Sequence, residues 1–351
     1  MIDMYKTKRS FFILASVLLL FLSAACTKSD TPAAYSVPED VFIPETFVAE
    51  VFGNADAVVT IISDDGFFES GMYLNELMKH YDLRASVAGV VDFIDPHLNE
   101  WKDVVNEDHI EVINHSYSHK TMKEGSLISY DYFSLRHQIV DSDRYYEKNF
   151  GKEQIVFIWP ENAMCSNGYS ILLKNGFWAS RSDYRGFNSL SPVDGCEGGQ
   201  WYRLNLFGIK DDGVDTAVRN GWIDQAVANN AWVIEMWHRV ALEEDEYFQT
   251  ITIEEASEHL DYLSEKVSSG EVWNPVFTDA VKYIREKQNS TVYTYISDGE
   301  LHIYVELTDG RMSYDTFNFP LTVGVNLRAD DEITYYNVIP GEELVVKVDG
   351  Q

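Results

Sequence analysis

The sequence predicts an α/β protein with a parallel sheet or barrel, followed by a small all-β domain. Between residues 56 and 288, short apolar segments rich in Val, Ile, Phe or Trp alternate with helix-like segments, as parallel α/β folds require. After residue 289 polar and apolar residues alternate, which is typical of half-buried strands. Asp298-Gly299 and Asp309-Gly310 fall between these later strands, where hairpin turns are expected.

Each expected element follows from a local pattern. Helical periodicity predicts Ser70–His80, Tyr130–Lys148 and Ile253–Ser268, the last beginning with a capping box formed by Thr252 and Glu255. The strands expected in the first region are Ala57–Ser63, Ala85–Val91, His109–Asn114, Gln154–Trp159, Gly176–Ala179 and Ala231–Trp237. Pro320–Leu327, Glu332–Val338 and Glu342–Val348 complete roughly five strands of a minimal sandwich-like domain.

The N-terminus has the pattern of an export signal. Lys6, Lys8 and Arg9 precede an apolar run and the small residues before Cys26. Cys26 resembles the acylated cysteine of bacterial lipoproteins, whereas Ser-Ala-Ala also suits an ordinary signal peptidase, so a secreted protein is the alternative. We expect an exported lipoprotein of the cell envelope, periplasmic or anchored to the outer membrane through a lipid on Cys26.

These patterns divide the chain into four parts. They are a signal peptide at 1–25, a polar tether and lead-in at 26–55, an α/β domain at 56–288 and a small β domain at 289–351. Cys165 and Cys196 could form a disulfide in an oxidising envelope, but their spacing does not fix their geometry.

The net charge limits the class of partner. Removing residues 1–25 takes away three basic groups and one acidic group, which changes the net charge from −30 to −32. Such a charge repels phosphate backbones and anionic glycans, so we expect no nucleic-acid partner. It favours metal cations and neutral or cationic sugars, although a solvated acidic surface explains it equally.

Two acidic residues follow the first predicted strand. Asp64 and Asp65 stand at its carboxyl end, and Gly66 allows the tight exit that would turn both carboxylates toward one site. Asp-Asp-Gly is also an ordinary turn sequence. Taken alone, this pair therefore does not identify a site.

Three histidines also follow predicted strands. His115 and His119 come after Ile110–Asn114, and a spacing of four would bring both imidazoles to one side of a helical turn. With Asp65 they make a two-histidine, one-carboxylate set, which suits zinc or another divalent cation. His238 comes after the last strand of the domain and is a candidate general acid.

The order and spacing of these motifs resemble the polysaccharide deacetylases of the NodB-homology group, also called carbohydrate esterase family 4. The family's Thr-Phe-Asp-Asp-Gly resembles residues 62–66, its His-Ser/Thr-x-x-His matches His115 to His119, and its late histidine matches His238. Phe157-Ile158-Trp159-Pro160 resembles its third motif, which normally reads Arg-x-Pro-Tyr. The resemblance covers about residues 55–288 and implies a distorted (β/α) barrel of the deacetylase type.

The resemblance also implies a role for each residue. Asp64 would be the general base, Asp65, His115 and His119 would hold a divalent metal, and His238 would be the general acid. The metal would be zinc, with cobalt or nickel as alternatives, and the substrate an acetylated glycan. We expect N-deacetylation of an amino sugar; O-deacetylation of an acetylated hemicellulose and an inactive glycan-binding lipoprotein are the alternatives.

The third motif departs from the family pattern. Ile158 occupies the place of the arginine that orients the base, and Glu161 replaces the tyrosine. Our candidate for the missing cation is Arg181, because its segment follows the next predicted strand and could present a guanidinium to Asp64. A surface arginine in a loop is the alternative.

Aromatic residues near the predicted site are candidate sugar-stacking platforms. Core packing explains any one of them equally well. The substrate-binding candidates are Tyr117, Trp159, Pro160, Trp201 and Trp237.

Overall fold

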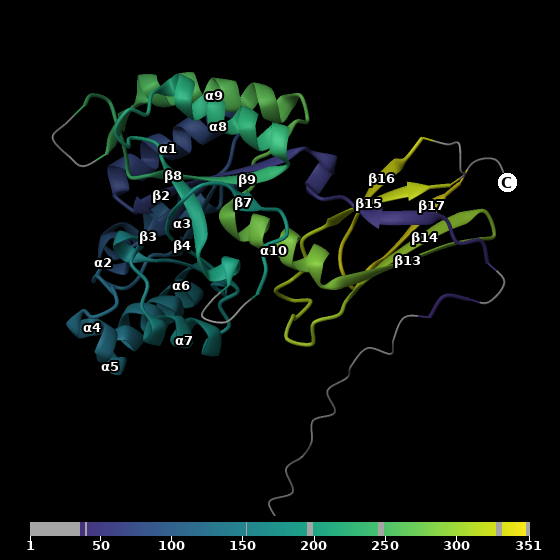
Figure 1. The fold of residues 1–351 in the computed structure, drawn as a ribbon, viewed down its shortest axis with the longest axis horizontal. Coiled ribbons are helices and arrows are strands. Elements are labelled where there is room, and N and C mark those ends of the chain that lie inside the picture. The colour runs from purple at the N-terminus through teal and green to yellow at the C-terminus, as the bar shows by residue number, and fades with distance from the viewer. Residues whose placement is uncertain are drawn as a thin grey trace, which may run out of the picture. The chain divides into compact units, whose positions relative to one another are not determined.

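In the part of the chain that the structure describes, seven parallel strands close into a barrel (Figure 1). The computed structural model describes residues 36–38, 41–151, 153–194, 199–244, 249–327 and 332–348. Each barrel strand pairs with the next, and the last pairs back to the first. The strands are β2 (Ala57–Asp65), β3 (Ala85–Gly89), β4 (Ile110–Asn114), β5 (Val156–Ile158), β6 (Ala179–Arg185), β8 (Leu204–Gly208) and β9 (Ala231–Trp237). The predicted barrel is confirmed.

The barrel strands are covered on both faces, which explains their continuous apolar composition. Every residue of β9 is buried, and only the last residue of β2 is partly exposed. Glu235 is the one charged residue of β9 and is fully buried. It accepts a hydrogen bond from Trp237 Nε1 at 3.1 Å and pairs with His259 Nε2 at 2.9 Å, so its burial is compensated.

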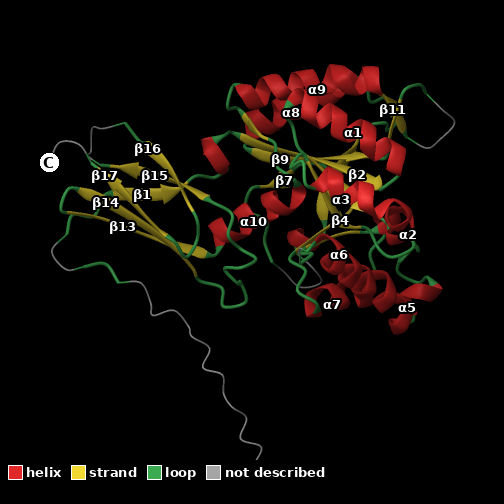
Figure 2. Ribbon diagram, turned by 180° about the vertical axis from the view of Figure 1, so that it is seen from behind, coloured by secondary structure: helices red, strands yellow, loops and turns green. Residues whose placement is uncertain are grey.

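Helices surround the barrel on two sides. In both views α1, α8 and α9 lie along one side and α5, α6 and α7 along the other (Figures 1 and 2). The helices are α1 (Phe68–Tyr81), α2 (Val91–Ile94), α3 (Leu98–Val105), α4 (Leu127–Tyr130), α5 (Tyr132–Arg136), α6 (Ser142–Phe150), α7 (Ser166–Lys174), α8 (Thr216–Asn229), α9 (Ile253–Ser268) and α10 (Phe277–Gln288). None of the described helices is long and apolar enough to cross a membrane.

The predicted helices are found with one change. The capping box of α9 is present, since Thr252 and Glu255 each bond the other's backbone. The single helix expected over Tyr130–Lys148 is instead α4, α5, a π-helical segment and α6. Asp131 causes the break between the first two, because its backbone is extended and its side-chain carboxylate caps α5 by accepting the Phe133 N–H.

Several short strands were not predicted. They have two to five residues and include polar positions, so neither length nor periodicity marks them. They are β7 (Asn188–Ser189), β8, β10 (Arg239–Ala241), β11 (Thr250–Thr252) and β12 (Val272–Trp273). The strand expected at Gly176–Ala179 begins at Ala179 and continues to Arg185 as β6.

Two three-stranded sheets form the small β domain, as expected. One contains β13 (Ser290–Ser297), β14 (Glu300–Leu307) and β17 (Glu343–Lys347); the other contains β1 (Glu45–Val48), β15 (Leu321–Asn326) and β16 (Thr334–Val338). Their inward residues are fully buried in one apolar cluster: Leu301, Ile303, Val305, Leu321, Val323 and Val325.

The structure differs from the sequence analysis at two points here. Asp298-Gly299 is a hairpin turn between β13 and β14, but Asp309-Gly310 is not, because β14 is followed by a strand of the other sheet. Residues 45–48, which we placed in the lead-in, pair with β15 as β1. The signal peptide, Cys26 and most of the predicted tether lie outside the described residues.

Glu286 on α10 places a carboxyl at the contact with the small β domain. Its side chain is fully buried, and its Oε1 accepts a hydrogen bond from the Phe319 N–H at 3.0 Å. Its Oε2 has no hydrogen-bond partner among the described residues. Burial raises the pKa of Glu286 to about 8.

This carboxyl is expected to make stability depend on pH. An acid with a raised pKa binds more protons in the folded state than in the unfolded state. The free energy of unfolding that protonated Glu286 contributes is therefore lost as pH rises from about 4.5 to about 8. The loss is on the order of 4 kcal/mol. Glu286→Gln removes the charge and keeps an acceptor, so it should raise the free energy of unfolding at pH 8 and flatten its pH dependence in urea titrations. Exposed Glu265→Gln is the control, and parallel curves for wild type and Glu286→Gln would contradict the expectation.

Candidate metal and acid–base site

The carboxyl end of β2 positions both acidic residues of the site. Asp64 is 4% exposed and its side chain points into the barrel end. Asp65 has a positive φ of 74° and Gly66 one of 78°, so the chain turns sharply and the two carboxylates diverge. A Cβ at Gly66 would lie 2.9 Å from Ile94 Cδ1 and 3.1 Å from Gly89 Cα, so only glycine fits this turn.

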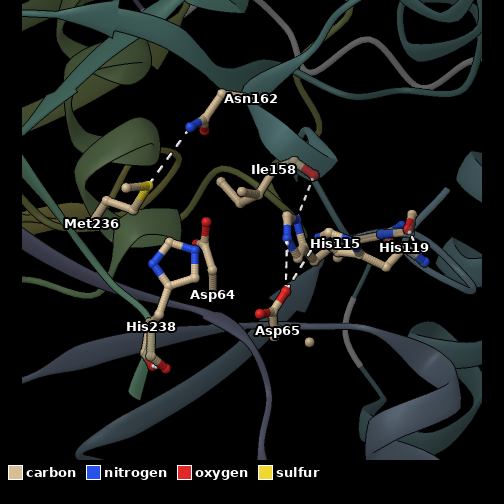
Figure 3. A network of polar contacts seen from close by, with 12 residues as sticks. Asp64, Asp65, His115, His119, Ile158, Asn162, Met236 and His238 are labelled. Carbon is tan, nitrogen blue, oxygen red and sulfur yellow. Dashed lines mark hydrogen bonds and ion pairs between the residues drawn. The ribbon is translucent and has the colours of Figure 1, made fainter. Parts of the chain in front are cut away.

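Asp65, His115 and His119 form a cluster of potential metal ligands (Figure 3). Asp65 Oδ1 lies 3.6 Å from His115 Nε2 and 3.2 Å from His119 Nε2. One ligand atom from each residue lies within 4.8 Å of the others, and no other such group occurs among the described residues. One carboxylate and two imidazoles leave coordination positions for water and substrate, so the cluster fits a catalytic divalent cation.

The surroundings fix the orientation of the two imidazoles. His115 Nδ1 lies 2.9 Å from the Ile158 carbonyl oxygen, which can only accept, so Nδ1 carries the proton and the lone pair of Nε2 faces the cluster. Burial and the neighbouring His115 lower the pKa of His119, which favours the neutral form that binds metals. The His115–His119 segment is a turn and not a helix, with Ser116 and His119 at positive φ.

Arg181 lies directly against Asp64. Arg181 Nη1 and Nη2 donate to the two carboxylate oxygens of Asp64 at 2.8 and 2.5 Å, and the guanidinium is fully buried. Nη2 also donates to Asn162 Oδ1 at 3.0 Å. Burial acts to raise the pKa of Asp64, but the charge of Arg181, followed by those of His115 and His238, holds it below its usual value. Asp64 is therefore fixed as a carboxylate.

The third motif contributes backbone groups in place of an arginine. Ile158 supplies the carbonyl that orients His115, as described above. Glu161 and Asn162 both have positive φ, at 54° and 53°, a conformation that costs non-glycine residues free energy. This turn directs Glu161 and Asn162 into the cavity, where Glu161 accepts a hydrogen bond from Thr121 at 2.6 Å.

His238 follows β9 and lies on the other side of Asp64 from the histidine pair (Figure 3). Its backbone carbonyl accepts a hydrogen bond from Ser63 Oγ at 3.2 Å, which ties the end of β9 to β2. Its charge contributes to the lowered pKa of Asp64. The structure thus brings together every acid, histidine and arginine that the sequence analysis selected.

These side chains surround one cavity of about 400 Å³. Its size suits a small part of a larger ligand. Some of its lining residues carry no sequence signal, because they come from short strands and loops that folding brings to the rim. The lining comprises Asp64, Asp65, His115, His119, Glu161, Asn162, Arg185, Leu206, Asp211, Met236, His238 and Gln249.

The proposed aromatic platforms are wrong in three cases. Trp159, Trp201 and Trp237 are fully buried, so none can stack on a sugar. Trp159 and Trp237 donate their indole N–H groups to Ser180 and Glu235, and the Arg285 guanidinium covers Trp201 at 3.9 Å.

Two further substrate-binding candidates also lie outside the cavity lining. Pro160 is buried, and Tyr117 packs against His137 with ring centroids 4.2 Å apart. The assignment of Pro160 is therefore corrected, whereas Tyr117 is partly exposed and its role in substrate binding stays a prediction. Cys165 is buried, and Cys196 lies outside the described residues, so their pairing stays an open prediction.

His115→Ala and His119→Ala should each abolish retention of a bound metal. A catalytic metal site with three protein ligands keeps little affinity for the metal once one ligand is lost. The measurement is metal content after gel filtration, with His137→Ala as the control because His137 is half exposed and pairs with Asp141 outside the cluster. Full metal occupancy in either cluster variant would remove that histidine from the ligand set.

The polysaccharide deacetylase family model matches residues 53–177. The matched segment contains Asp64 and the cluster of Asp65, His115 and His119. It ends before β6, which carries Arg181, and before β9, which His238 follows. The resemblance inferred from the motifs is confirmed over this segment. A search of curated proteins finds no match.

Several solved structures are similar to this chain. A family 4 carbohydrate esterase from Streptomyces lividans in complex with acetate is 14% identical, with a TM-score of 0.43 over 62% of this chain and 91% of that one. A family 4 acetyl xylan esterase from Clostridium thermocellum in complex with a cobalt ion is 15% identical, with a TM-score of 0.43 over 64% and 89%. A pseudoenzyme of the same family from Bacillus anthracis is 16% identical, with a TM-score of 0.42 over 64% and 65%. Scores at this level do not establish a shared fold, so the barrel is defined by its own strand pairing.

Proposed function

Because residues 53–177 match the polysaccharide deacetylase family model, we propose that this protein is a metal-dependent hydrolase that removes acetyl groups from an acetylated polysaccharide. One observation supports the proposal most directly. A carboxylate fixed by a buried arginine adjoins a two-histidine, one-carboxylate cluster in a single cavity, with a further histidine on the opposite side. A protein that only binds glycans has no need of this arrangement.

Asp65, His115 and His119 would hold the metal. The fit rests on the donor set and on the Nδ1 proton of His115, which leaves Nε2 free to coordinate. A cation bound there would polarise an acetyl carbonyl and lower the pKa of a water. Zinc suits these ligands best, and cobalt or nickel would suit the same set.

Asp64 and His238 would perform the proton transfers. Asp64 is kept ionised by Arg181 and lies beside the cluster, so it can take a proton from the attacking water. His238 lies across the cavity from the histidine pair and can give a proton to the leaving nitrogen or oxygen. Because Arg181 binds both oxygens of Asp64, the base cannot rotate away from the water.

We infer that the acetyl group is removed from nitrogen. Deacetylation of an amino sugar gives a cationic product, which suits a mature chain of net charge −32 and a cavity lined by Glu161. An O-acetyl esterase acting on hemicellulose is the alternative.

Acetate release from a panel of acetylated glycans tests this function. Release from an N-acetylated glycan, its loss with a chelator and its recovery with zinc or cobalt are the expected results. Release from acetylated xylan alone would select the esterase. Binding of a glycan without release from any substrate would leave an inactive glycan-binding protein.

We also propose that the chain is exported and anchored through a lipid on Cys26, as the N-terminal pattern indicates. Cys26→Ser should then move the protein from the membrane fraction to the soluble fraction and abolish palmitate labelling. Cys165→Ser is the control, since Cys165 is buried. Wild-type protein without Cys26-dependent label would instead be a soluble secreted protein.

A further inference from the structure

Four large apolar side chains project into solvent from α4 and α5. Leu127 is 92% exposed, Tyr130 70%, Tyr132 56% and Phe133 81%. Scattered single apolar residues are common on protein surfaces, but four within seven positions form a patch, and patches mark interaction sites. We name these four residues the aromatic shelf.

The shelf has a defined structure. The Ser126 hydroxyl caps α4 by accepting the Ser129 N–H, and Asp131 caps α5. Asn167 Nδ2 at the start of α7 donates to the Ser129 carbonyl at 2.8 Å. Because these contacts hold the backbone of both helices, little backbone entropy would be lost when a ligand binds to the exposed side chains.

A short stretch of chain connects the shelf to the wall of the cavity. The segment before it begins at Thr121, whose hydroxyl donates to Glu161 in the cavity wall at 2.6 Å. Leu127 is six positions after Thr121, so the chain keeps them within about 20 Å of each other. Glu124 accepts the backbone N–H of Ser166, which fixes this segment against the start of α7 at the carboxyl end of the barrel.

The position of the elements agrees with this connection. In both views α5 lies beside α7, on the side of the barrel opposite α8 and α9 (Figures 1 and 2). α7 follows β5 and begins near the carboxyl ends of the strands, where the cavity lies. The shelf therefore belongs to the same side of the barrel as α7, and a long ligand that extends from the cavity on this side could reach it.

We propose that the aromatic shelf binds the acetylated polysaccharide chain outside the cavity and so selects polymers over short substrates. The proposal rests on the proposed function. The cavity of about 400 Å³ holds only a small part of a polymer, so further sugars must lie on the adjoining surface. Tyr and Phe rings offer apolar faces to sugar rings.

Charge favours a neutral glycan over a membrane as the occupant. Within residues 121–136, Lys123 and Arg136 balance Glu124 and Asp131. A membrane-binding surface typically combines apolar residues with an excess of basic ones that attract anionic lipids. The shelf lacks that excess, and the whole chain carries a net charge of −30.

The test compares wild type with the variant Leu127→Ser/Tyr130→Ser/Phe133→Ser. These side chains are exposed, so folding should be unaffected, which thermal unfolding checks. Ile43→Ser is the matched control, because Ile43 is 64% exposed on the segment leading to β1. The readouts are co-sedimentation with insoluble chitin and with acetylated xylan, and acetate release from polymer and from an acetylated disaccharide.

We expect the variant to bind the polymer about tenfold more weakly or worse. Its acetate release should fall on the polymer through KM and stay at the wild-type rate on the disaccharide. If the variant and the wild type bind the polymer equally and have the same KM on it, the proposed role of the shelf is wrong, even if both enzymes are active. If the wild type releases no acetate yet binds polymer through the shelf, the proposed activity fails and the shelf stands.

Two other occupants would give different results. Shelf-dependent binding to vesicles of phosphatidylethanolamine and phosphatidylglycerol, without binding to glycan, would make the surface a membrane contact. A concentration-dependent dimer that the triple variant abolishes, seen by light scattering, would make it a contact between two copies of this chain. Either result would replace the proposal.

Discussion

Arg181→Met is expected to lower turnover by about 10²–10⁴-fold and to destabilise the folded protein by about 3–5 kcal/mol. Both effects follow from the two hydrogen bonds that this buried guanidinium donates to Asp64. Methionine fills much of the same volume but has no charge. It would leave the Asp64 carboxylate buried without its partner, which costs more than a surface ion pair contributes.

The pH profile should separate a positioning role from a purely structural one. Burial raises the pKa of Asp64 and the charge of Arg181 lowers it, so removing Arg181 moves that pKa upward. As the proposed base, Asp64 must be ionised to accept a proton. The acid limb of kcat/KM should therefore move to higher pH in Arg181→Met.

A matched exposed arginine provides the control. Arg144 on α6 is 62% exposed and pairs with Asp141, just before α6, at 3.5 Å. Arg144→Met should change stability by less than about 1 kcal/mol and leave the pH profile unchanged. Urea unfolding of the metal-free proteins and rates across pH give both quantities. An acid limb that does not move in Arg181→Met would show that Arg181 does not control the base.

Arg181 also shows where the sequence was informative and where it was not. The strand expected before it was placed at Gly176–Ala179, because the polar Ser180-Arg181-Ser182 that follows does not resemble a buried strand. In the structure β6 continues through these residues, and all three are buried. The interior of the barrel becomes polar near the site, and apolar patterning cannot detect a strand there.

The strand-end acids and histidines were predictable because each follows a continuous apolar run, and parallel strands deliver their carboxyl ends to one edge. The aromatic candidates failed for a different reason. A tryptophan in a core and one on a rim have the same local sequence, and only tertiary packing separates Trp159, fully buried, from Phe133, 81% exposed. β1 was missed because its partner β15 lies about 280 positions away in the sequence.

Asp64→Asn and Asp65→Asn should separate the general base from the metal ligand. Asp64→Asn is expected to keep the metal and lose about 10²–10⁴-fold in turnover, because an amide can bond a water but cannot accept its proton. Asp65→Asn should weaken metal binding as well. Its Oδ1 lies 3.2 Å from His119 Nε2 in the ligand cluster, so the substitution removes a negative charge from the metal site.

Isothermal metal titration and acetate-release rates on both variants measure the two effects independently. The amide of Asp64→Asn also presents an NH₂ group to the Arg181 guanidinium, so one of the two hydrogen bonds must be lost, and the thermal stability of the variant reports that loss. Glu161→Gln is the control for an acid in the same cavity that is outside the ligand cluster, and it should retain the metal. Near-normal turnover by Asp64→Asn would exclude Asp64 as the base. If metal affinity instead falls equally in both aspartate variants, the charge of Asp64 also contributes to metal binding. Asp64 would then be part of the metal site as well as the proton acceptor.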